Sequence, residues 1–355
     1  MRIGKENKLL IIAPYQFGEL SDYYYWAKYA TLEGWRITYI GYKYKNRVFK
    51  ERKYPGVKVK SVMRINNRLI LGMYFYLHCI IEILLGHHNN IVICRMPQCQ
   101  LLARLFPKRN VILDVRTLSV SEDEKHRKKQ DTSLIKIKNH FAKCTVISKG
   151  VGQRIGLPYY LLPLGAEELS IKAKSFDKIR LFYIGTFNNR DLSTFIKGLA
   201  LYQKETGKEA TFDIVGGGTD NEEINLKNSV IYSGVKGVSF HGYLTHEESK
   251  KFFDNCNIGV CYVPMKDYYQ FQPPTKLYEY LLSGMAVLST RTVSNVAVMS
   301  NHNGVLVDDN AVSVCNGLKE LSSKMDTYSS SVIVDDSKKH HWKHIVNNNL
   351  LSLMQ

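Results

Sequence analysis

Lys276 and Glu279 are the two side chains whose types and spacing point most directly to chemistry. They lie in the segment PPTKLYEYLLSGMAVLST, where an N-cap at Thr275 and a stop at Gly284 predict a short helix. A lysine in the first turn of a helix can bind a phosphate together with the free backbone N–H groups there. A carboxylate one turn later on the same face can accept hydrogen bonds from ribose hydroxyls. The alternative is a solvated Lys–Glu pair on an ordinary surface helix.

This segment resembles the nucleotide-sugar-binding signature of GT-B glycosyltransferases of the group 1 (GT4-like) type, and the resemblance implies a member of that family that acts in bacterial surface-polysaccharide synthesis. In that family a lysine and a glutamate hold the phosphates and the ribose of the donor. The resemblance therefore assigns these two roles to Lys276 and Glu279. The family often carries a further glutamate near the transferred sugar, and Phe271 occupies that position here. This departure leaves the expected ribose contact intact and removes the expected carboxylate beside the sugar.

Three more residues of the second half fall where the resemblance implies donor contacts. Gly185 follows a buried strand, and Arg190 follows five residues later. A strand–glycine–helix unit presents backbone N–H groups to an anion, and a guanidinium can add a bidentate contact. The family places a basic residue of this loop on the donor diphosphate, and a residue corresponding to Tyr243 near the nucleotide base. His241, close by, is expected to be a half-buried structural histidine.

The first half reads as alternating strands and helices, beginning with a strand over Lys8–Ala13. This order is typical of a doubly wound sheet, which binds ligands at the carboxyl ends of its strands. In GT-B proteins the loop after the first strand faces the cleft, so Gly18 is a candidate acceptor contact. Asp114 ends another predicted strand and is a candidate base or acceptor-orienting group, with Arg116 beside it. A cap or turn role for Asp114 is an equal alternative.

The length of 355 residues predicts two domains. The resemblance implies two Rossmann-like α/β domains facing a cleft, at residues 1–170 and 171–330. A closing helix over 331–355 is expected to pack back on the first domain, as in GT-B relatives.

Several other kinds of site lack their signatures in this sequence. Neither the dinucleotide-binding glycine pattern nor a GxxxxGK loop occurs, and no two aspartates are spaced as in a DxD metal motif. The expected chemistry is therefore metal-independent and needs no cofactor. His340 and His344 have a spacing compatible with a metal, but the neighbouring lysines favour a solvated helix.

The net charge of +17 is confined to one half of the chain. Residues 1–177 hold 31 Lys/Arg and 14 Asp/Glu, whereas residues 178–355 hold 18 of each. This asymmetry predicts that the first half meets a polyanion, either nucleic acid or an acidic membrane. An apolar run of 18 residues, Leu69–Gly86, is interrupted by His78 and Glu82 and predicts a buried or interfacial helix. With the basic cluster Lys43–Lys60 and the two arginines before it, this helix could lie against anionic lipid.

Seven cysteines without a CxxC pair, and a short apolar run at the N-terminus, favour a cytoplasmic protein. The sequence thus predicts a peripheral membrane glycosyltransferase that moves a sugar from a nucleoside-diphosphate sugar to a lipid-linked glycan. A nucleotide-sugar epimerase of the same architecture, or a catalytically silent binding subunit, is the alternative.

Overall fold

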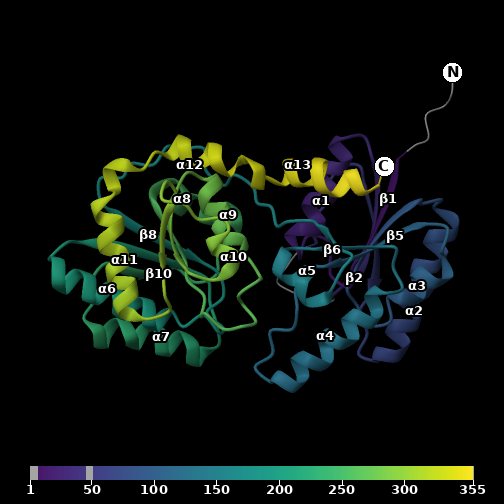
Figure 1. Cartoon of the computed structure of the whole chain (residues 1–355), viewed down its shortest axis with the longest axis horizontal. Coiled ribbons are helices and arrows are strands. Elements are labelled where there is room, and N and C mark those ends of the chain that lie inside the picture. The colour runs from purple at the N-terminus through teal and green to yellow at the C-terminus, as the bar shows by residue number, and fades with distance from the viewer. Residues whose placement is uncertain (1–6, 45–50, 355) are drawn as a thin grey trace. The chain divides into compact units, whose positions relative to one another are not determined.

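The structure is a computed structural model that describes residues 7–44 and 51–354. Part of the basic cluster expected over 43–60 lies outside the described residues. The chain divides into two compact units (Figure 1). The first unit comprises residues 1–164 and 342–355, and the second comprises residues 165–341. The sequence placed these boundaries at 170 and 330.

The first unit is built on a seven-stranded parallel sheet with the order β3-β2-β1-β4-β5-β6-β7. Its central strands are nearly continuous apolar runs, because helices cover both faces of a parallel sheet. The strands are β1 (Lys8–Ile12), β2 (Arg36–Lys43), β3 (Val57–Met63), β4 (Asn90–Cys94), β5 (Asn110–Val115), β6 (Lys143–Val146) and β7 (Tyr160–Leu161). The helices are α1 (Ser21–Leu32), α2 (Arg68–Leu85), α3 (Gln100–Leu105), α4 (Glu124–Lys138), α5 (Lys149–Ile155) and α13 (Trp342–Ile345).

The direction of the crossovers decides which face each helix covers. The chain steps from β1 to β2 in one direction and from β3 to β4 in the other. Right-handed connections therefore place α1 on one face, and α2, α3 and α4 on the opposite face. The C-terminal segment covers the α1 face, where the ring of Trp342 stacks on Tyr25 at 5.8 Å between centroids.

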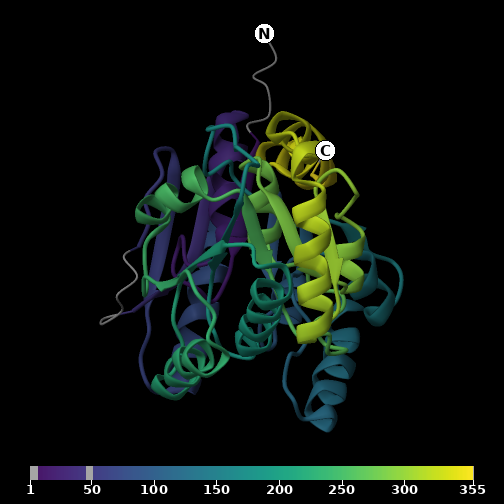
Figure 2. The same cartoon turned by 90° about the vertical axis from the view of Figure 1, so that its left-hand side faces the viewer.

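The second unit has a six-stranded parallel sheet with the order β10-β9-β8-β11-β12-β13. Its strands are β8 (Ile179–Ile184), β9 (Ala210–Val215), β10 (Val238–Phe240), β11 (Ile258–Cys261), β12 (Ala286–Thr290) and β13 (Gly304–Val307). Its helices are α6 (Leu192–Thr206), α7 (Asp220–Ser233), α8 (His246–Asn255), α9 (Thr275–Leu282), α10 (Val293–Val296), α11 (Ala311–Ser323) and α12 (Ser330–Ser337). Figure 2 shows α11 running alongside the strands of this sheet.

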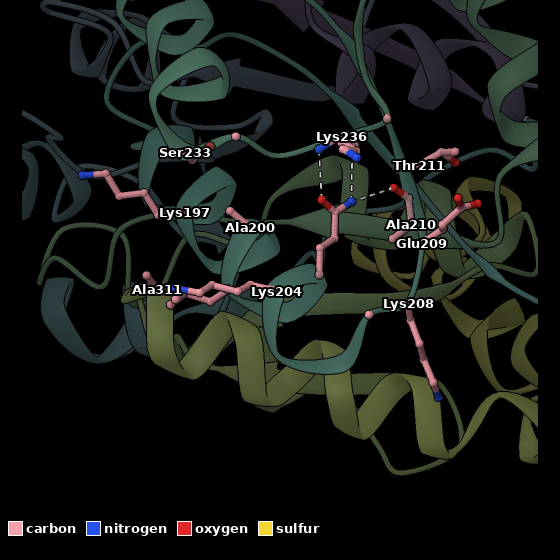
Figure 3. Close-up of a pocket in the computed structure, with 15 residues that line it drawn as sticks. Lys197, Ala200, Lys204, Lys208, Glu209, Ala210, Thr211, Ser233, Lys236 and Ala311 are labelled. Atoms are coloured by element: carbon pink, nitrogen blue, oxygen red, sulfur yellow. Dashed lines mark hydrogen bonds between the residues drawn. The ribbon is translucent and has the colours of Figure 1, made fainter.

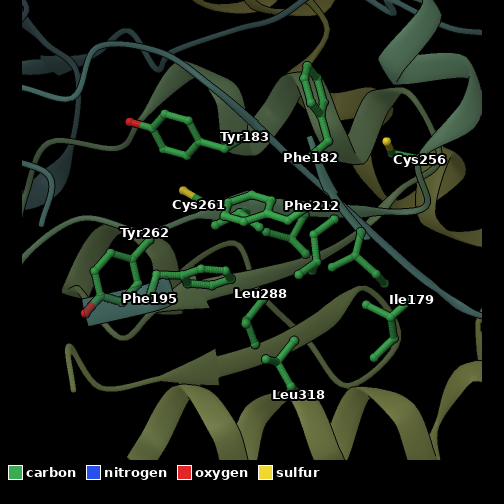
Figure 4. Close-up of a cluster of buried hydrophobic side chains, with 14 of the residues drawn as sticks. Ile179, Phe182, Tyr183, Phe195, Phe212, Cys256, Cys261, Tyr262, Leu288 and Leu318 are labelled. Atoms are coloured by element: carbon green, nitrogen blue, oxygen red, sulfur yellow. The ribbon is translucent and has the colours of Figure 1, made fainter. Parts of the chain in front are cut away.

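Aromatic side chains fill much of the core of the second unit. Phe195 packs on Phe212 and on Tyr262, with ring centroids 5.1 and 5.7 Å apart (Figure 4). Phe182 packs on the other side of the sheet against α8 and α9. The two doubly wound parallel sheets confirm the predicted fold class of two Rossmann-like α/β domains.

Three details of the elements differ from the sequence prediction. Helix α9 begins at Thr275, so the residue that precedes it, Pro274, takes the N-cap position with an extended backbone. Strand β3 was not predicted, because its lysines were interpreted as part of a basic cluster, although Lys58 and Lys60 alternate with apolar residues as in an edge strand. The C-terminal segment forms short helical turns instead of one helix.

Candidate functional site

The strand order of the second unit reverses between β8 and β11. The chain runs outward from β8 through β9 to β10 on one side, and from β11 through β12 to β13 on the other. Loops that leave the carboxyl ends of β8 and β11 diverge at this point, which is where open α/β sheets bind ligands. Gly185 follows β8 directly, and α9 follows the loop after β11.

Helix α9 is held tightly against the end of β8. Leu277, Tyr280 and Leu281 are fully buried on its inner face. The hydroxyl of Tyr280 accepts a hydrogen bond of 3.1 Å from the backbone N–H of Ile184, the last residue of β8. The N-terminus of α9 is therefore fixed beside the glycine loop that follows this strand.

Gly185 is required because the chain crowds it on two sides. A Cβ built there would lie 2.9 Å from Nζ of Lys276, and its φ of +145° disfavours any other residue. A Cβ built on Gly216, in the loop after β9, would lie 1.8 Å from the carbonyl oxygen of Gly185. The backbones of the loops after β8 and β9 and the side chain of Lys276 thus converge at the switch point, where the strand order of the sheet reverses.

Lys276 is the most informative residue at this point. Part of its stem reaches the surface, but Nζ is buried and has no hydrogen-bond partner among the described residues. Nζ lies 3.6 Å from the ring centroid of Tyr183, whose hydroxyl donates to the carbonyl of Thr186. Burial lowers the pKa of Lys276 to about 7, and the charge of Arg190 adds to the lowering. A buried ammonium group that lacks a partner is a site for an anion.

The N-terminus of α9 differs from those of its neighbours. Among the described residues no side chain caps it, whereas α7 and α8 both have complete capping boxes. At α7, Glu223 accepts from the N–H of Gly218, and Glu222 accepts from the N–H of Thr219. These carboxylates exclude an anion from α7. The uncapped first turn of α9 is therefore a better anion site than the first turn of α7.

Arg190 belongs to the same cluster. Its guanidinium carbon lies 5.0 Å from the ring centroid of Tyr269, in the loop that leads into α9. Asn189 and Asp191 on either side have positive φ angles of 52° and 48°, a conformation seldom adopted by residues other than glycine. Gly185, Arg190 and Lys276, which the sequence named separately, thus meet around one point.

Glu279 lies one turn along α9 from Lys276. Its side chain is 14% exposed, and Oε1 lies 3.5 Å from Nε2 of His246, the first residue of α8. The carboxylate is thus accessible and near the lysine, as a ribose contact requires. The sequence did not single out His246 or Tyr183, because a tyrosine in a buried strand reads as core and an exposed histidine carries no spacing signal.

Replacing Glu279 by alanine should weaken nucleoside-diphosphate binding by about 1–2 kcal/mol, roughly 5- to 30-fold, because the ribose loses a charged acceptor. Calorimetric titration measures this change. Glu247→Ala, which removes an exposed carboxylate from the neighbouring helix α8, is the matched control and should bind normally. Equal affinities in the two variants would contradict the ribose role of Glu279.

Tyr243 and His241 lie at the other side of the loop after β9. Tyr243 is 77% exposed, and a Cβ built on Gly217 would lie 3.2 Å from its ring, so an aromatic face is available beside the glycine loop. His241 is half-buried with Nε2 2.7 Å from Oδ1 of Asp213, which fits the structural role expected of it. Phe271 is half-buried in the loop before α9.

Comparison with known proteins identifies this region. Residues 178–324 match the family model described as glycosyl transferases group 1. The second unit is thus similar to the domain of group 1 glycosyltransferases. The match confirms the resemblance drawn from the segment around Lys276. No curated protein matches the chain by sequence.

Solved structures match the whole chain at low sequence identity. Sucrose-phosphate synthase from Thermosynechococcus elongatus has a TM-score of 0.72 and 14% identity, covering 98% of each chain. The lipopolysaccharide outer core galactosyltransferase WaaB has a TM-score of 0.69 and 14% identity, covering 97% of this chain and 99% of its own. HepE from Anabaena, in complex with UDP and glucose, has a TM-score of 0.71 and 11% identity, covering 98% of this chain and 100% of its own. The fold of this protein is therefore that of GT-B glycosyltransferases.

A separate hollow of about 990 Å³, whose lining includes neither Lys276 nor Arg190, lies at the ends of α6 and α7 (Figure 3). Four exposed lysines line it, and the amide of Gln203 bridges the carbonyls of Ala210 and Lys236. The C-terminus of a helix carries partial negative charge, which disfavours an anion, and the lysines near the ends of α6 and α7 offset that charge. This hollow is not the candidate site.

The acceptor-side candidates lie in the first unit, and two of them form one buried network. Asp114 is fully buried, and its two oxygens accept hydrogen bonds from Tyr23 at 3.0 Å and Thr145 at 2.8 Å. Burial raises the pKa of Asp114 to about 6, against the opposing charge of Arg116. Arg116 pairs with Asp22 and donates to the carbonyl of Leu162. Their acceptor roles stay predictions, since these contacts favour structural roles for both side chains.

Thr145→Val tests this structural interpretation. The variant keeps the shape of the side chain but removes one hydrogen bond to the buried carboxylate of Asp114. The free energy of unfolding should fall by about 1–2 kcal/mol. Thermal denaturation should then show a lower Tm, while nucleotide binding by the second unit stays unchanged. An unchanged Tm would mean that the network does not stabilise the first unit.

Gly18 has a φ of +87° and is buried, and a Cβ there would lie 2.6 Å from the side chain of Arg52. Its acceptor role also stays a prediction. Of the C-terminal histidines, His340 packs on Tyr278, and His341 lies 3.9 Å from Glu167. Within residues 7–44 and 51–354, no group of three or more His, Cys, Asp or Glu is placed to hold a metal ion.

Proposed function

We propose that this protein transfers a sugar from a nucleoside-diphosphate sugar to a hydroxyl group of a lipid-linked glycan, as in the assembly of bacterial surface polysaccharides. The observation that carries the proposal is the buried, unpartnered Nζ of Lys276 at the switch point of a group 1 domain. Two similar structures support the donor class, since HepE contains UDP and glucose and a trehalose-6-phosphate protein from E. coli contains UDP-2-fluoro glucose.

The site offers positive charge where the reaction needs it. Cleavage of the bond between the sugar and the diphosphate leaves negative charge on the departing phosphate. In the proposed complex, Lys276, Arg190 and the uncapped first turn of α9 face the phosphate on which that charge develops. Such preorganised charges are most effective in a site from which water is excluded. The expected contact of Tyr243 with the base completes the donor site.

The acceptor is proposed to reach the first unit from the cytoplasmic face of a membrane. This unit holds 30 Lys/Arg and 11 Asp/Glu, a net charge of +19, whereas the second unit holds 19 and 21, a net charge of −2. A strongly basic surface attracts anionic lipid headgroups. An acidic membrane, not nucleic acid, is therefore the proposed polyanionic partner.

We expect activity to survive treatment with EDTA, because fixed cationic side chains can stabilise the leaving diphosphate without a metal and the sequence has no DxD pair. The measurement is transfer of labelled sugar before and after chelation. Loss of activity that only Mg²⁺ or Mn²⁺ restores would contradict the proposed way in which the diphosphate is stabilised.

The decisive experiment is a panel of nucleoside diphosphates and their sugar derivatives, titrated by calorimetry and followed by product analysis. A transferase needs an acceptor, an epimerase converts the donor alone, and a silent subunit binds without turnover. The silent-subunit outcome needs to be tested because Phe271 occupies the position where the family often carries a carboxylate near the sugar. Binding of no member of the panel would contradict the proposal.

A further inference from the structure

Helix α2 of the first unit is apolar on its exposed face as well as on its buried face, unlike an ordinary surface helix. Every exposed position after Arg68 carries an apolar or aromatic side chain. These form the α2 stripe: Leu69, Ile70, Met73, Tyr74, Leu77, Ile81, Leu84 and Leu85. No other described helix exposes more than three large hydrophobic side chains. A soluble surface helix normally directs its charged residues to this side.

The one carboxylate of α2 lies on the protein side. Glu82 is buried, pairs with Lys60 of β3, and lies 2.9 Å from Nε2 of His88. Leu71, Phe75 and Ile83 face the same way and are buried against the unit. The carboxylate of Glu82, which interrupts the apolar run, is thus paired on the buried side of the helix. The exposed face of α2 is therefore continuously apolar.

The length and composition of α2 would suffice for a membrane span. However, one side of the helix is buried against the first unit. Its inner face is joined to β3 and to the segment after the helix through Glu82, and the Tyr76 hydroxyl donates to the carbonyl of Pro97. One side is covered by protein and the other is open. A helix of 18 residues, about 27 Å long, can therefore enter a bilayer only sideways, in the plane of the interface.

Basic residues border the α2 stripe at both ends. Arg64 and Arg68 are exposed at its N-terminal end. Lys58 shares a strand face with Lys60, which contacts Glu82 near the end of the helix, so Lys58 lies toward the C-terminal end of the stripe. A second copy of this chain would bring another unit of charge +19 against these residues. An anionic lipid surface complements both the charge and the apolar face.

We infer that the α2 stripe is a membrane-docking surface, which inserts lengthwise into the headgroup region of an anionic bilayer while Arg64, Arg68 and Lys58 contact lipid phosphates. The inference rests on the proposed function only for the acceptor that this docking would bring to the first unit. The contacts of α2 themselves are independent of the donor site.

Leu77→Glu provides the test, because it places a charge in the middle of the α2 stripe on a side chain that is 53% exposed. Ile224→Glu on α7 of the second unit, where the side chain is 54% exposed, is the matched control. The full chain is sedimented with phosphatidylcholine vesicles with and without phosphatidylglycerol. Wild type and Ile224→Glu should bind the acidic vesicles, and Leu77→Glu should bind at least about tenfold less. Equal binding by all three proteins, or no binding by wild type, would overturn the inference.

A label at Met73 reports insertion directly. All seven native cysteines are buried, so Met73→Cys can be labelled selectively with an environment-sensitive fluorophore. Its emission should shift to the blue on acidic vesicles and be quenched by brominated lipid, while a label at Ile224→Cys should not change. An unquenched label at position 73 on bound protein would overturn the inference. A lipid-free dimer that Leu77→Glu dissociates would also overturn it, since the stripe would then bind a second copy.

Calorimetry with nucleoside diphosphates on the same proteins separates this inference from the proposed function. Vesicle binding through α2 without nucleotide binding would refute the glycosyltransferase proposal and leave the docking surface in place. Normal nucleotide binding, together with vesicle binding by Leu77→Glu equal to that of wild type, would refute the docking surface and leave the glycosyltransferase proposal in place.

Discussion

Replacing Lys276 by methionine should weaken nucleoside-diphosphate binding by about 2–3 kcal/mol, roughly 30- to 150-fold. Methionine keeps most of the unbranched stem over Tyr183 and removes only the ammonium group. A diphosphate would then lose the one buried cation at the switch point whose Nζ has no hydrogen-bond partner among the described residues. Calorimetric titration of the two proteins measures the loss.

The same substitution should stabilise the protein without ligand. A buried ammonium group that lacks a partner costs free energy in the folded state, and methionine removes that cost. Thermal denaturation should therefore show a higher Tm for Lys276→Met, in the opposite direction to its effect on binding. Lys197→Met, at an exposed position of the same unit, should change neither quantity. Unchanged affinity in Lys276→Met would remove this lysine from the donor site.

The fold and part of the site could be predicted because they depend on local patterns. Alternating buried strands and helices indicate a doubly wound sheet wherever they occur. The pairing of Lys276 with Glu279 depends only on helical spacing, and the structure places the two one turn apart on α9. The loop residues Gly185 and Arg190 were assigned from their place after a strand together with the resemblance to group 1 glycosyltransferases.

The remaining features depend on contacts between distant parts of the chain. The sequence places Asp114 at a strand end, but only the fold shows Tyr23 and Thr145 closing around its carboxylate. Likewise, Glu82 interrupts an apolar run in sequence, whereas in the structure Lys60 and His88 neutralise it on the inner side. The burial of Nζ in Lys276 could not be predicted either, because Nζ packs on Tyr183 of strand β8, which is distant in sequence.

Donor binding should also weaken as the pH rises. In the free protein, burial holds the pKa of Lys276 at about 7, so at higher pH the side chain is mostly neutral. A bound diphosphate favours the ammonium form, which raises the pKa toward its ordinary value of about 10.4. Binding must then be accompanied by proton uptake. For these two values, linkage predicts that affinity falls about 50-fold between pH 7 and pH 9.

A nucleoside-diphosphate sugar is the right ligand for this measurement, because its esterified phosphates do not titrate in that range. Lys276→Met should show a nearly flat profile, since methionine has no proton to gain. The free protein should show the opposite trend in stability. Its unfolded state binds more protons at residue 276 between the pKa of about 7 and the ordinary value, so this residue makes stability rise with pH across that window. A pH profile of binding that is the same in wild type and Lys276→Met would mean that the ammonium group does not contact the donor.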